Sequence, residues 1–356
     1  MDKEEFQLKL NESISNYLSK TDLFNARKTV LLCTNENKDL CLSSLKENSC
    51  YVDELELIPK EEFDNSIKKI DNSKNYFISY ELINEKYYLN LLSKIDKDHL
   101  YIGPTSKGYF DLYEKRQKIF DSLENITEVY NLLADQKSRT TFINIITRLC
   151  LPYQFHFYYE PEDFPQYFAD DFNYSNEEVF LDAGVCDGQN IIEFIKIVRK
   201  YKKIYGIEAD TENFLKCQNN LRYVSNLILL NRALHSCSEK LSFFSSSKTG
   251  KKGNAHVQPG GDIEVQGIIG DDFDIKPTFI KMDIEGSEKE ALNGLKNTIA
   301  EAAPKLSICI YHFQTDFWEI PLLIKKLNPR YSIKIRNHEN MHNLLESVCY
   351  AFIGDK

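Results

Sequence analysis

The sequence predicts an α/β protein with two domains. Short apolar runs typical of strands alternate with amphipathic segments typical of helices, once over residues 28–106 and again from residue 178 onward. Alternation of this kind favours βαβ units and parallel sheets. At 356 residues the chain is too long for one compact core. We therefore expect a small domain at residues 1–106, a helical linker at 107–150 and a larger domain at 151–356.

Residues 1–106 predict a small Rossmann-like α/β domain that holds no nucleotide. Apolar positions at helical spacing within residues 1–20 predict an N-terminal helix, and the short apolar runs after it predict a parallel sheet. The turn after the first run, residues 34–39, contains no glycine. A phosphate cradle needs backbone amides that side chains would obstruct, so a glycine loop for a dinucleotide is missing here.

Seven strands are expected in the larger domain. They are the runs VFLDAG, KIYGIEA, LILLNRAL, PTFIKMD, KLSICIYH, YSIKIRN and SVCYAFI. No obvious helix joins the last two, so we expect these two to pair antiparallel. The run EKLSFFSSS at 239–247 is expected to add a hairpin strand. The aromatic, proline-broken segment 153–168 either covers a pocket or packs between domains, and packing is the favoured interpretation.

Composition and charge exclude several classes of protein. The formal net charge of −10 argues against a protein that binds nucleic acid, because phosphate binding needs clustered lysine and arginine. No run of about 18 apolar residues occurs, so we expect no membrane span. The N-terminal residues lack the apolar core of a secretory signal, and the nine cysteines form no C-x-x-C pair. Buried thiols in a reducing compartment fit this pattern, so we expect a cytoplasmic protein.

A glycine turn follows the first strand of the second series. It reads DAGVCDG, and it carries Asp182, Gly184 and Gly188 between the strand and the next helix. A strand, a glycine turn and a helix in this order let a ligand approach the backbone and the helix N-terminus. The acidic residue would repel a pyrophosphate and suits a cationic ligand better, such as the sulfonium and ammonium groups of S-adenosylmethionine. The alternative is an ordinary turn between a strand and a helix.

An acidic residue ends the second strand of this series. Glu208 lies where a carboxylate accepts hydrogen bonds from ribose hydroxyls in a doubly wound sheet. The alternative is a solvated acid at a strand end. The neighbouring Asp210 fits that description or the N-cap of the next helix.

Further candidate residues follow the fourth and fifth strands. Asp283, Glu285 and Glu288 lie in the run KMDIEGSE, at the carboxyl edge where open α/β sheets bind ligands. Glu288 is also explained as an acid in the first turn of a helix. His312 ends the fifth strand, with Asp316 four residues further on. An imidazole there is either a general base for a methyl acceptor or a strand-end histidine bonded to a neighbour.

Together these motifs resemble a known family. The strings DAGVCDG, YGIEAD, FIKMDIEGSE and CIYH, in this order, are similar to those of the FkbM-like S-adenosylmethionine-dependent methyltransferases. The string K-x-D-x-E-G-x-E at 281–288 is the most specific part, and the resemblance covers residues 178–354, about half of the chain. It implies a class I methyltransferase fold, which is Rossmann-like with a seven-stranded sheet and an antiparallel seventh strand. The strand count made above agrees with this expectation.

The resemblance also implies roles for individual residues. The residues implied to bind S-adenosylmethionine are Asp182, Gly184 and Gly188 at its methionine part, Glu208 at the ribose, Ala209 and Asp210 beside the adenosine, Asn231 and Ala233 near the adenine, and Asp283 at the methyl donor. Glu285 or His312 would face the acceptor. At 185–187 the sequence Val-Cys-Asp departs from the Ala-Asn-Ile that is more common in relatives. Some relatives that act on sugars use a divalent metal, but the spacing of Asp283, Glu285 and His312 does not indicate one.

We therefore expect an S-adenosylmethionine-dependent O-methyltransferase that acts on a sugar hydroxyl in glycan or nucleotide-sugar biosynthesis. His312 would accept the proton of the acceptor, with Glu285 or Asp316 as an alternative or orienting partner. The alternatives are an N-methyltransferase for an amino sugar or amino acid, and a non-catalytic scaffold that retains the fold. An NAD-linked oxidoreductase is disfavoured because the sequence contains no G-x-G-x-x-G. The N-terminal domain would bind the acceptor, form a homo-oligomer or only stabilise the fold.

Overall fold

The chain divides into two compact units in the computed structural model. The structure describes residues 1–22, 28–35, 38–39, 41–42, 52–59, 62, 71, 73–78, 100–102, 112–150, 162–244, 256–257, 260–261, 263–273, 275–338 and 346–354. The first unit comprises Met1–Asn131, Thr140–Pro161 and Glu339–Leu344. The second unit comprises Leu132–Arg139, Glu162–His338 and Leu345–Lys356.

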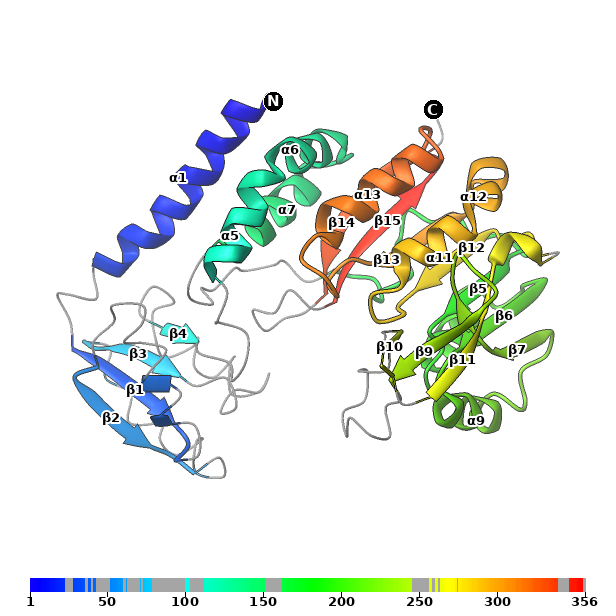
Figure 1. The fold of residues 1–356 in the computed structure, drawn as a ribbon, viewed down its shortest axis with the longest axis horizontal. Coiled ribbons are helices and arrows are strands. Elements are labelled where there is room, and N and C mark those ends of the chain that lie inside the picture. The colour runs from blue at the N-terminus through cyan, green and yellow to red at the C-terminus, as the bar shows by residue number, and fades with distance from the viewer. Residues whose placement is uncertain are drawn as a thin grey trace. The chain divides into compact units, whose positions relative to one another are not determined.

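The first unit contains a parallel sheet of four strands. Its elements are α1 (Lys3–Asp22), β1 (Thr29–Cys33), β2 (Glu54–Leu57), β3 (Asn75–Ile78) and β4 (Leu100–Ile102), and the strand order is β2-β1-β3-β4 (Figure 1). The apolar residues of β1 are buried, as expected of a central parallel strand. The helices predicted between these strands lie largely outside the described residues. Where the sequence predicted a helical linker, the chain forms α5 (Leu112–Asp121), α6 (Leu123–Leu132) and α7 (Gln136–Leu149).

The second unit is built on a sheet of seven strands, so the predicted fold class is confirmed. The strands are β5 (Val179–Ala183), β6 (Lys203–Glu208), β7 (Leu227–Asn231), β12 (Phe279–Met282), β13 (Lys305–Cys309), β14 (Ser332–Asn337) and β15 (Ser347–Phe352). Their order is β14-β15-β13-β12-β5-β6-β7 (Figure 1). All neighbours pair parallel except β15, which runs antiparallel to both β13 and β14. The helices that alternate with these strands are α8 (Gln189–Val198), α9 (Thr211–Asn220), α11 (Glu288–Gly294), α12 (Lys296–Ala302) and α13 (Asp316–Leu327).

Three details of this unit differ from the sequence prediction. The run LILLNRAL is not one strand, because it divides into β7 in the large sheet and β8 (Ala233–Leu234) in a second sheet. That second sheet also holds β9 (Lys240–Phe244), β10 (His256–Val257) and β11 (Ile263–Ile268), and of these only β9 was predicted. The helix expected after the fourth strand is two helices, α11 and α12. Gly294 ends α11, where a Cβ atom would lie only 2.2 Å from the carbonyl oxygen of His235.

An aromatic cluster fills the core between the large sheet and the segment that precedes it. Phe180 of β5 stacks on Phe194 of α8 and on Phe279 of β12, with ring centroids 4.5 and 4.8 Å apart. Phe168 and Phe172 pack edge-on against Phe279. The described end of the aromatic segment 153–168 therefore packs into the core of the second unit. Burial of these rings is a main source of the stability of this unit.

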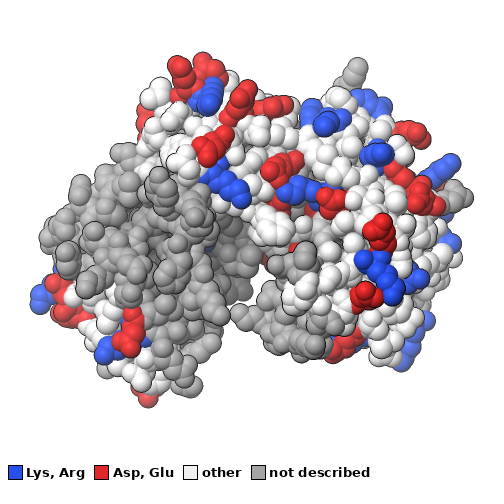
Figure 2. Space-filling view, in the orientation of Figure 1, with Lys and Arg blue, Asp and Glu red and all other residues white. Residues whose placement is uncertain are grey.

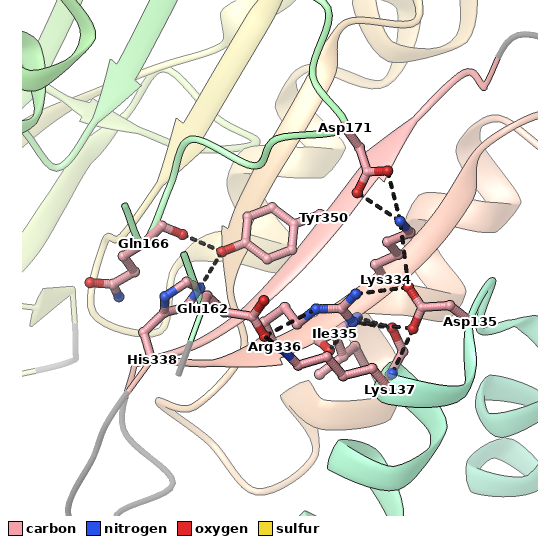
Figure 3. Close-up of polar contacts among 11 residues, drawn as sticks. Asp135, Lys137, Glu162, Gln166, Asp171, Lys334, Ile335, Arg336, His338 and Tyr350 are labelled. Carbon is pink, nitrogen blue, oxygen red and sulfur yellow. Dashed lines mark hydrogen bonds and ion pairs between the residues drawn. The ribbon is translucent and has the colours of Figure 1, made fainter. Parts of the chain in front are cut away.

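Polar contacts attach the residues before α7 to the C-terminal strands (Figure 3). The Arg336 guanidinium of β14 donates to Asp135 Oδ2 at 2.7 Å and to Ser138 Oγ at 2.6 Å, and its Nε lies 3.2 Å from Glu162 Oε1. Burial acts to raise the pKa of Asp135, but its hydrogen bonds with Arg336 and Ser138 hold that pKa well below its usual range. These contacts explain why residues 132–139 belong to the second unit.

Charged side chains of both signs are interspersed over the face of the molecule drawn in Figure 2. This distribution fits the mixed charge of the sequence, with 44 basic and 54 acidic residues. Within the part of the chain that the structure describes, no helix has the length and apolar character needed to cross a bilayer.

A partly buried histidine beside this polar cluster, His338, predicts a loss of stability in acid. Burial lowers the pKa of His338 to about 4, and the positive charges of Arg336 and Lys137 act in the same direction. In the unfolded chain the pKa of histidine is about 6.5. Because only the unfolded state binds this proton between those values, the free energy of unfolding should fall as the pH drops from about 6.5 to about 4. Urea denaturation at several pH values should show a shallower fall for His338→Gln, and equal slopes would contradict the assignment.

Candidate active site

A cavity opens at the carboxyl ends of β5, β6 and β12, in the second unit. The empty space in it, counted together with the solvent at its open mouth, is about 760 Å³. Six of the sequence-predicted site residues line it, namely Gly184, Glu208, Ala209, Ala233, Asp283 and Glu285. Apolar side chains complete part of the wall, among them Ile207, Leu234, Phe243 and Val257. Leu234, Phe243 and Val257 come from β8, β9 and β10, so the second sheet contributes to the cavity together with the large sheet.

The glycine turn after β5 brings two backbone segments into contact. Gly184 has a φ of +81°, and a Cβ atom on it would lie 1.8 Å from the carbonyl oxygen of Asp283. Gly188 has a φ of +94° at the N-cap of α8, where a Cβ atom would meet the Leu221 side chain at 2.9 Å. Only glycine fits at position 184, and this residue lines the cavity. Gly188 instead allows α8 to pack closely against Leu221, and it is not among the lining residues.

A buried ion pair lies beneath this turn. Asp182 and Lys281 are both almost fully buried, and Lys281 Nζ lies 3.0 Å from Asp182 Oδ1. The ammonium group also donates to the carbonyl oxygens of Gly184 at 2.7 Å and Ala183 at 3.3 Å. Burial acts to lower the pKa of Lys281, but the charge of Asp182 raises it, so the lysine carries its charge. Asp182 is thus not among the residues that line the cavity.

Glu208 is held at the cavity wall by two backbone amides. Its Oε2 accepts the N–H of Cys186 at 2.7 Å, and its Oε1 accepts the N–H of Asp210 at 2.8 Å. Burial raises the pKa of Glu208, and these two hydrogen bonds oppose that effect. Each carboxylate oxygen therefore uses one acceptor position on the backbone and keeps another for a ligand.

Two residues that the sequence assigned to the cofactor support the strand ends. Asp210 is the N-cap of α9, and its carboxylate accepts the N–H groups of Glu212 and Asn213 at 2.9 and 3.0 Å. Asn231 donates from Nδ2 to the carbonyl oxygens of Glu208 and Ala209 at 2.9 and 3.1 Å. Both residues fix the ends of β6 and β7, and neither is among the residues that line the cavity.

His312 lies among three carboxylates. Its Nε2 is 3.3 Å from Glu285 Oε2 and 3.4 Å from Asp283 Oδ1, and its Nδ1 is 3.1 Å from Glu288 Oε1. Burial acts to lower the pKa of His312, but the facing Glu285 and Glu288 carboxylates and the charge of Asp283 raise it to about 11. The side chain is only 9% exposed. In this arrangement His312 is an imidazolium at neutral pH and has no free nitrogen with which to accept a proton.

The other acidic residues of this edge differ in exposure. Glu285 lines the cavity with 27% of its side chain exposed, and it holds a φ of +54°, which is rare for a residue other than glycine. Glu288 is fully buried, and its Oε1 accepts the N–H of Ile284 at 2.9 Å. Asp316 is also buried and lies at the start of α13. Its carboxylate accepts the N–H of Phe313 at 2.9 Å and contacts Lys289 Nζ at 3.3 Å, and it is not among the lining residues.

The same edge has the donors for a divalent cation. Asp283, Glu288 and His312 each offer one ligand atom, and these three atoms lie within 4.8 Å of one another. Oxygen and nitrogen donors of this kind suit several divalent metals. A protonated His312 balances the same carboxylates, so the arrangement accommodates either a cation or a proton.

Three residues in or beside the site were not assigned a role from the sequence. Lys281 belongs to a recognised string, but its burial against Asp182 depends on the fold. Tyr167 and Tyr311 donate their hydroxyls to Asp283. Tyr311 directly precedes the predicted His312, whereas Tyr167 comes from a segment whose aromatic composition was the only signal.

The three carboxylates around His312 predict a titration at unusually high pH. Since the pKa of His312 is about 11 in the folded protein and about 6.5 in the unfolded chain, its contribution to stability is complete below pH 6.5 and is lost as the pH rises toward 11. NMR of the histidine ring nitrogens should find His312 protonated up to about pH 9, with His312→Gln identifying the signal. A midpoint near 6.5 would contradict this interpretation.

The close approach at Gly184 predicts that an alanine there lowers the free energy of unfolding by more than its backbone conformation alone would. Gly184→Ala places a Cβ against the Asp283 carbonyl oxygen, whereas Gly260→Ala, at a similar φ of +85°, meets no described atom within 4 Å. The left-handed conformation costs about 1–2 kcal/mol in both. The clash should add at least about 2 kcal/mol to the loss at Gly184. Urea denaturation of both variants measures the difference, and equal losses would show that the contact is not tight.

Comparisons with known proteins find a match within residues 182–350. A family model described as the methyltransferase FkbM domain matches residues 182–350. No curated protein matches the sequence.

Solved structures resemble the chain to different extents. The crystal structure of methyltransferase FkbM from Methylobacillus flagellatus KT aligns over 97% of this chain and 99% of that chain, with a TM-score of 0.64 and 18% identity. An rRNA methylase from Streptococcus thermophilus aligns over 51% of this chain and 90% of its own, with a TM-score of 0.32 and 14% identity. Aeropyrum pernix fibrillarin, in complex with natively bound S-adenosyl-L-methionine, aligns over 50% of this chain and 67% of its own, with a TM-score of 0.30 and 9% identity. Residues 182–350 therefore match the methyltransferase FkbM domain, and the prediction of a methyltransferase, made from the motifs, is confirmed.

Proposed function

We propose that the protein is an S-adenosylmethionine-dependent O-methyltransferase that acts on a sugar hydroxyl in glycan or nucleotide-sugar biosynthesis. The observation that carries the proposal is the cavity at the carboxyl edge, which Gly184, Glu208 and Asp283 line together. In open α/β sheets this edge is where ligands bind. A cytoplasmic location and a homo-oligomer formed through the N-terminal residues belong to the same proposal.

The residues that line the cavity fit S-adenosylmethionine. This cofactor supplies a methyl group on a positively charged sulfonium. Glu208 keeps one acceptor position on each oxygen for the ribose hydroxyls, because its backbone contacts use only the other two. Ala233, Phe243 and Val257 offer an apolar wall for the adenine. The carboxylate of Asp283 complements the charge of the methyl donor.

The acceptor would lie against the exposed side chain of Glu285. His312 is an imidazolium and Asp316 is held by Phe313 and Lys289, so neither is placed to take a proton. Glu285 lines the cavity and has part of its carboxylate exposed. In this proposal Glu285 accepts the hydrogen bond of the acceptor hydroxyl and then its proton, while His312 holds Glu285 and Asp283 in place. Positioning of the two reactants supplies most of the rate enhancement.

A second candidate function follows from the charge of the same edge. Asp283, Glu285 and Glu288 surround one imidazolium, so carboxylates outnumber cations there. A protonated amine binds such an edge more favourably than a neutral hydroxyl does. An N-methyltransferase for an amino sugar or an amino acid is therefore the second candidate.

Calorimetry with S-adenosylhomocysteine tests the cofactor assignment. We expect micromolar binding to the wild type and none of NAD. Glu208→Gln should weaken binding about tenfold or more, because the amide NH₂ group would face a backbone N–H or a ribose hydroxyl in place of an acceptor. Glu264→Gln is the matched control, since Glu264 is exposed on β11, where it pairs with Lys240. Absence of binding to the wild type would overturn the proposal and favour a scaffold that retains the fold. A methyl-transfer screen of nucleotide sugars against amino sugars then separates the two candidate functions.

A further inference from the structure

A tyrosine upstream of the FkbM domain reaches the candidate active site. Tyr167 precedes the matched residues 182–350, yet its hydroxyl donates to Oδ2 of Asp283 at 2.9 Å. The hydroxyl of Tyr311 donates to Oδ1 of the same carboxylate at 3.2 Å. Each oxygen of Asp283 is therefore held by a phenol, one on each side.

The main chain of Asp283 is fixed as firmly as its side chain. Its N–H donates to the carbonyl oxygen of Ala183 at 3.1 Å. Its own carbonyl oxygen lies against Gly184, where there is no room for a Cβ atom. The side chain can still rotate about χ1 and χ2, and the χ2 distribution of aspartate is broad unless hydrogen bonds restrict it. The two tyrosine hydroxyls supply that restriction.

Tyr167 is itself held rigidly from several directions. Its carbonyl oxygen accepts the Ser307 hydroxyl at 2.7 Å, and Lys281 Nζ lies 5.1 Å above its ring. The preceding carbonyl, that of Gln166, accepts the hydroxyl of Tyr350 (Figure 3). Tyr167 is only 5% exposed and is not among the residues that line the cavity. Because the Tyr167 hydroxyl is already fixed, it can orient the Asp283 carboxylate with little loss of conformational entropy when a ligand binds.

We propose that Tyr167 is a positioning residue that aims the Asp283 carboxylate at the positively charged group of the methyl donor. This inference rests on the proposed function. S-adenosylmethionine and S-adenosylhomocysteine differ by one methyl group and the positive charge at sulfur, so a correctly aimed carboxylate favours the first of the two. Without the Tyr167 hydroxyl, Oδ2 loses this donor while Oδ1 keeps its contacts with Tyr311 and His312, so the carboxylate is less firmly aimed.

Calorimetric titration of Tyr167→Phe with each of the two ligands tests this role. We expect the Kd for S-adenosylmethionine to rise about tenfold and the Kd for S-adenosylhomocysteine to change less than about threefold, as for loss of one hydrogen bond to a charged group. In an Asp283→Asn background the same substitution should have no further effect on either Kd, because Tyr167 acts only through Asp283. Tyr331→Phe is the matched control. Tyr331 is equally buried and loses a hydroxyl contact of 2.7 Å to the carbonyl oxygen of Pro304, with no contact to Asp283.

The outcomes separate this inference from the proposed function. Two outcomes would overturn the positioning role while the proposed function stands, provided that the wild type binds both ligands. In the first, Tyr167→Phe raises the two Kd values by the same factor. In the second, it raises them just as strongly in the Asp283→Asn background. If the wild type binds neither ligand, both are overturned. Thermal denaturation of each variant checks that the fold is retained. The inference is supported if Tyr167→Phe is as stable as Tyr331→Phe and the ratio of its two Kd values is altered.

Discussion

The buried ion pair between Lys281 and Asp182 is the interaction on which the site depends. It joins the central strands β5 and β12, and the same ammonium group donates to two carbonyl oxygens of the glycine turn. Removing either partner would leave a buried charge uncompensated, at a cost of about 3–5 kcal/mol. The turn carries Gly184, which lies against the main chain of Asp283, so the pair supports two residues that line the cavity.

The charge at the carboxyl edge depends on which cations contact its carboxylates, and Arg232 also lines the cavity. Lys281 is engaged with Asp182, so His312 is the cation that contacts the three carboxylates of the site among the described residues. Those carboxylates raise the pKa of His312 to about 11 although its burial opposes this. The pKa of His338 is lowered instead, because of its burial and the nearby charge of Arg336, so this histidine is neutral. Two histidines of one unit thus differ in charge because of the groups that face them.

The functional unit is larger than the domain that the family comparison matches. Residues 162–174 precede the matched range, yet their aromatic rings pack against β5 and β12 and Tyr167 contacts Asp283. Residues 132–139 join the same unit through Arg336. These segments stabilise the sheet from outside the motif-bearing strands, and one of them contributes directly to the arrangement of the site.

The sequence by itself determined the α/β class, the seven strands and the candidates Gly184, Glu208 and Asp283, because each of these residues follows a recognisable strand and must lie at its carboxyl end. The tertiary structure alone decided which candidates line the cavity, the charge of His312 and the contact of Tyr167 with Asp283. The division of the third predicted strand and the place of β11 in a second sheet also depended on it. Periodicity and spacing report on neighbours along the chain. Strand pairing and burial bring distant residues together, and the resulting contacts decide the charge and orientation of each side chain.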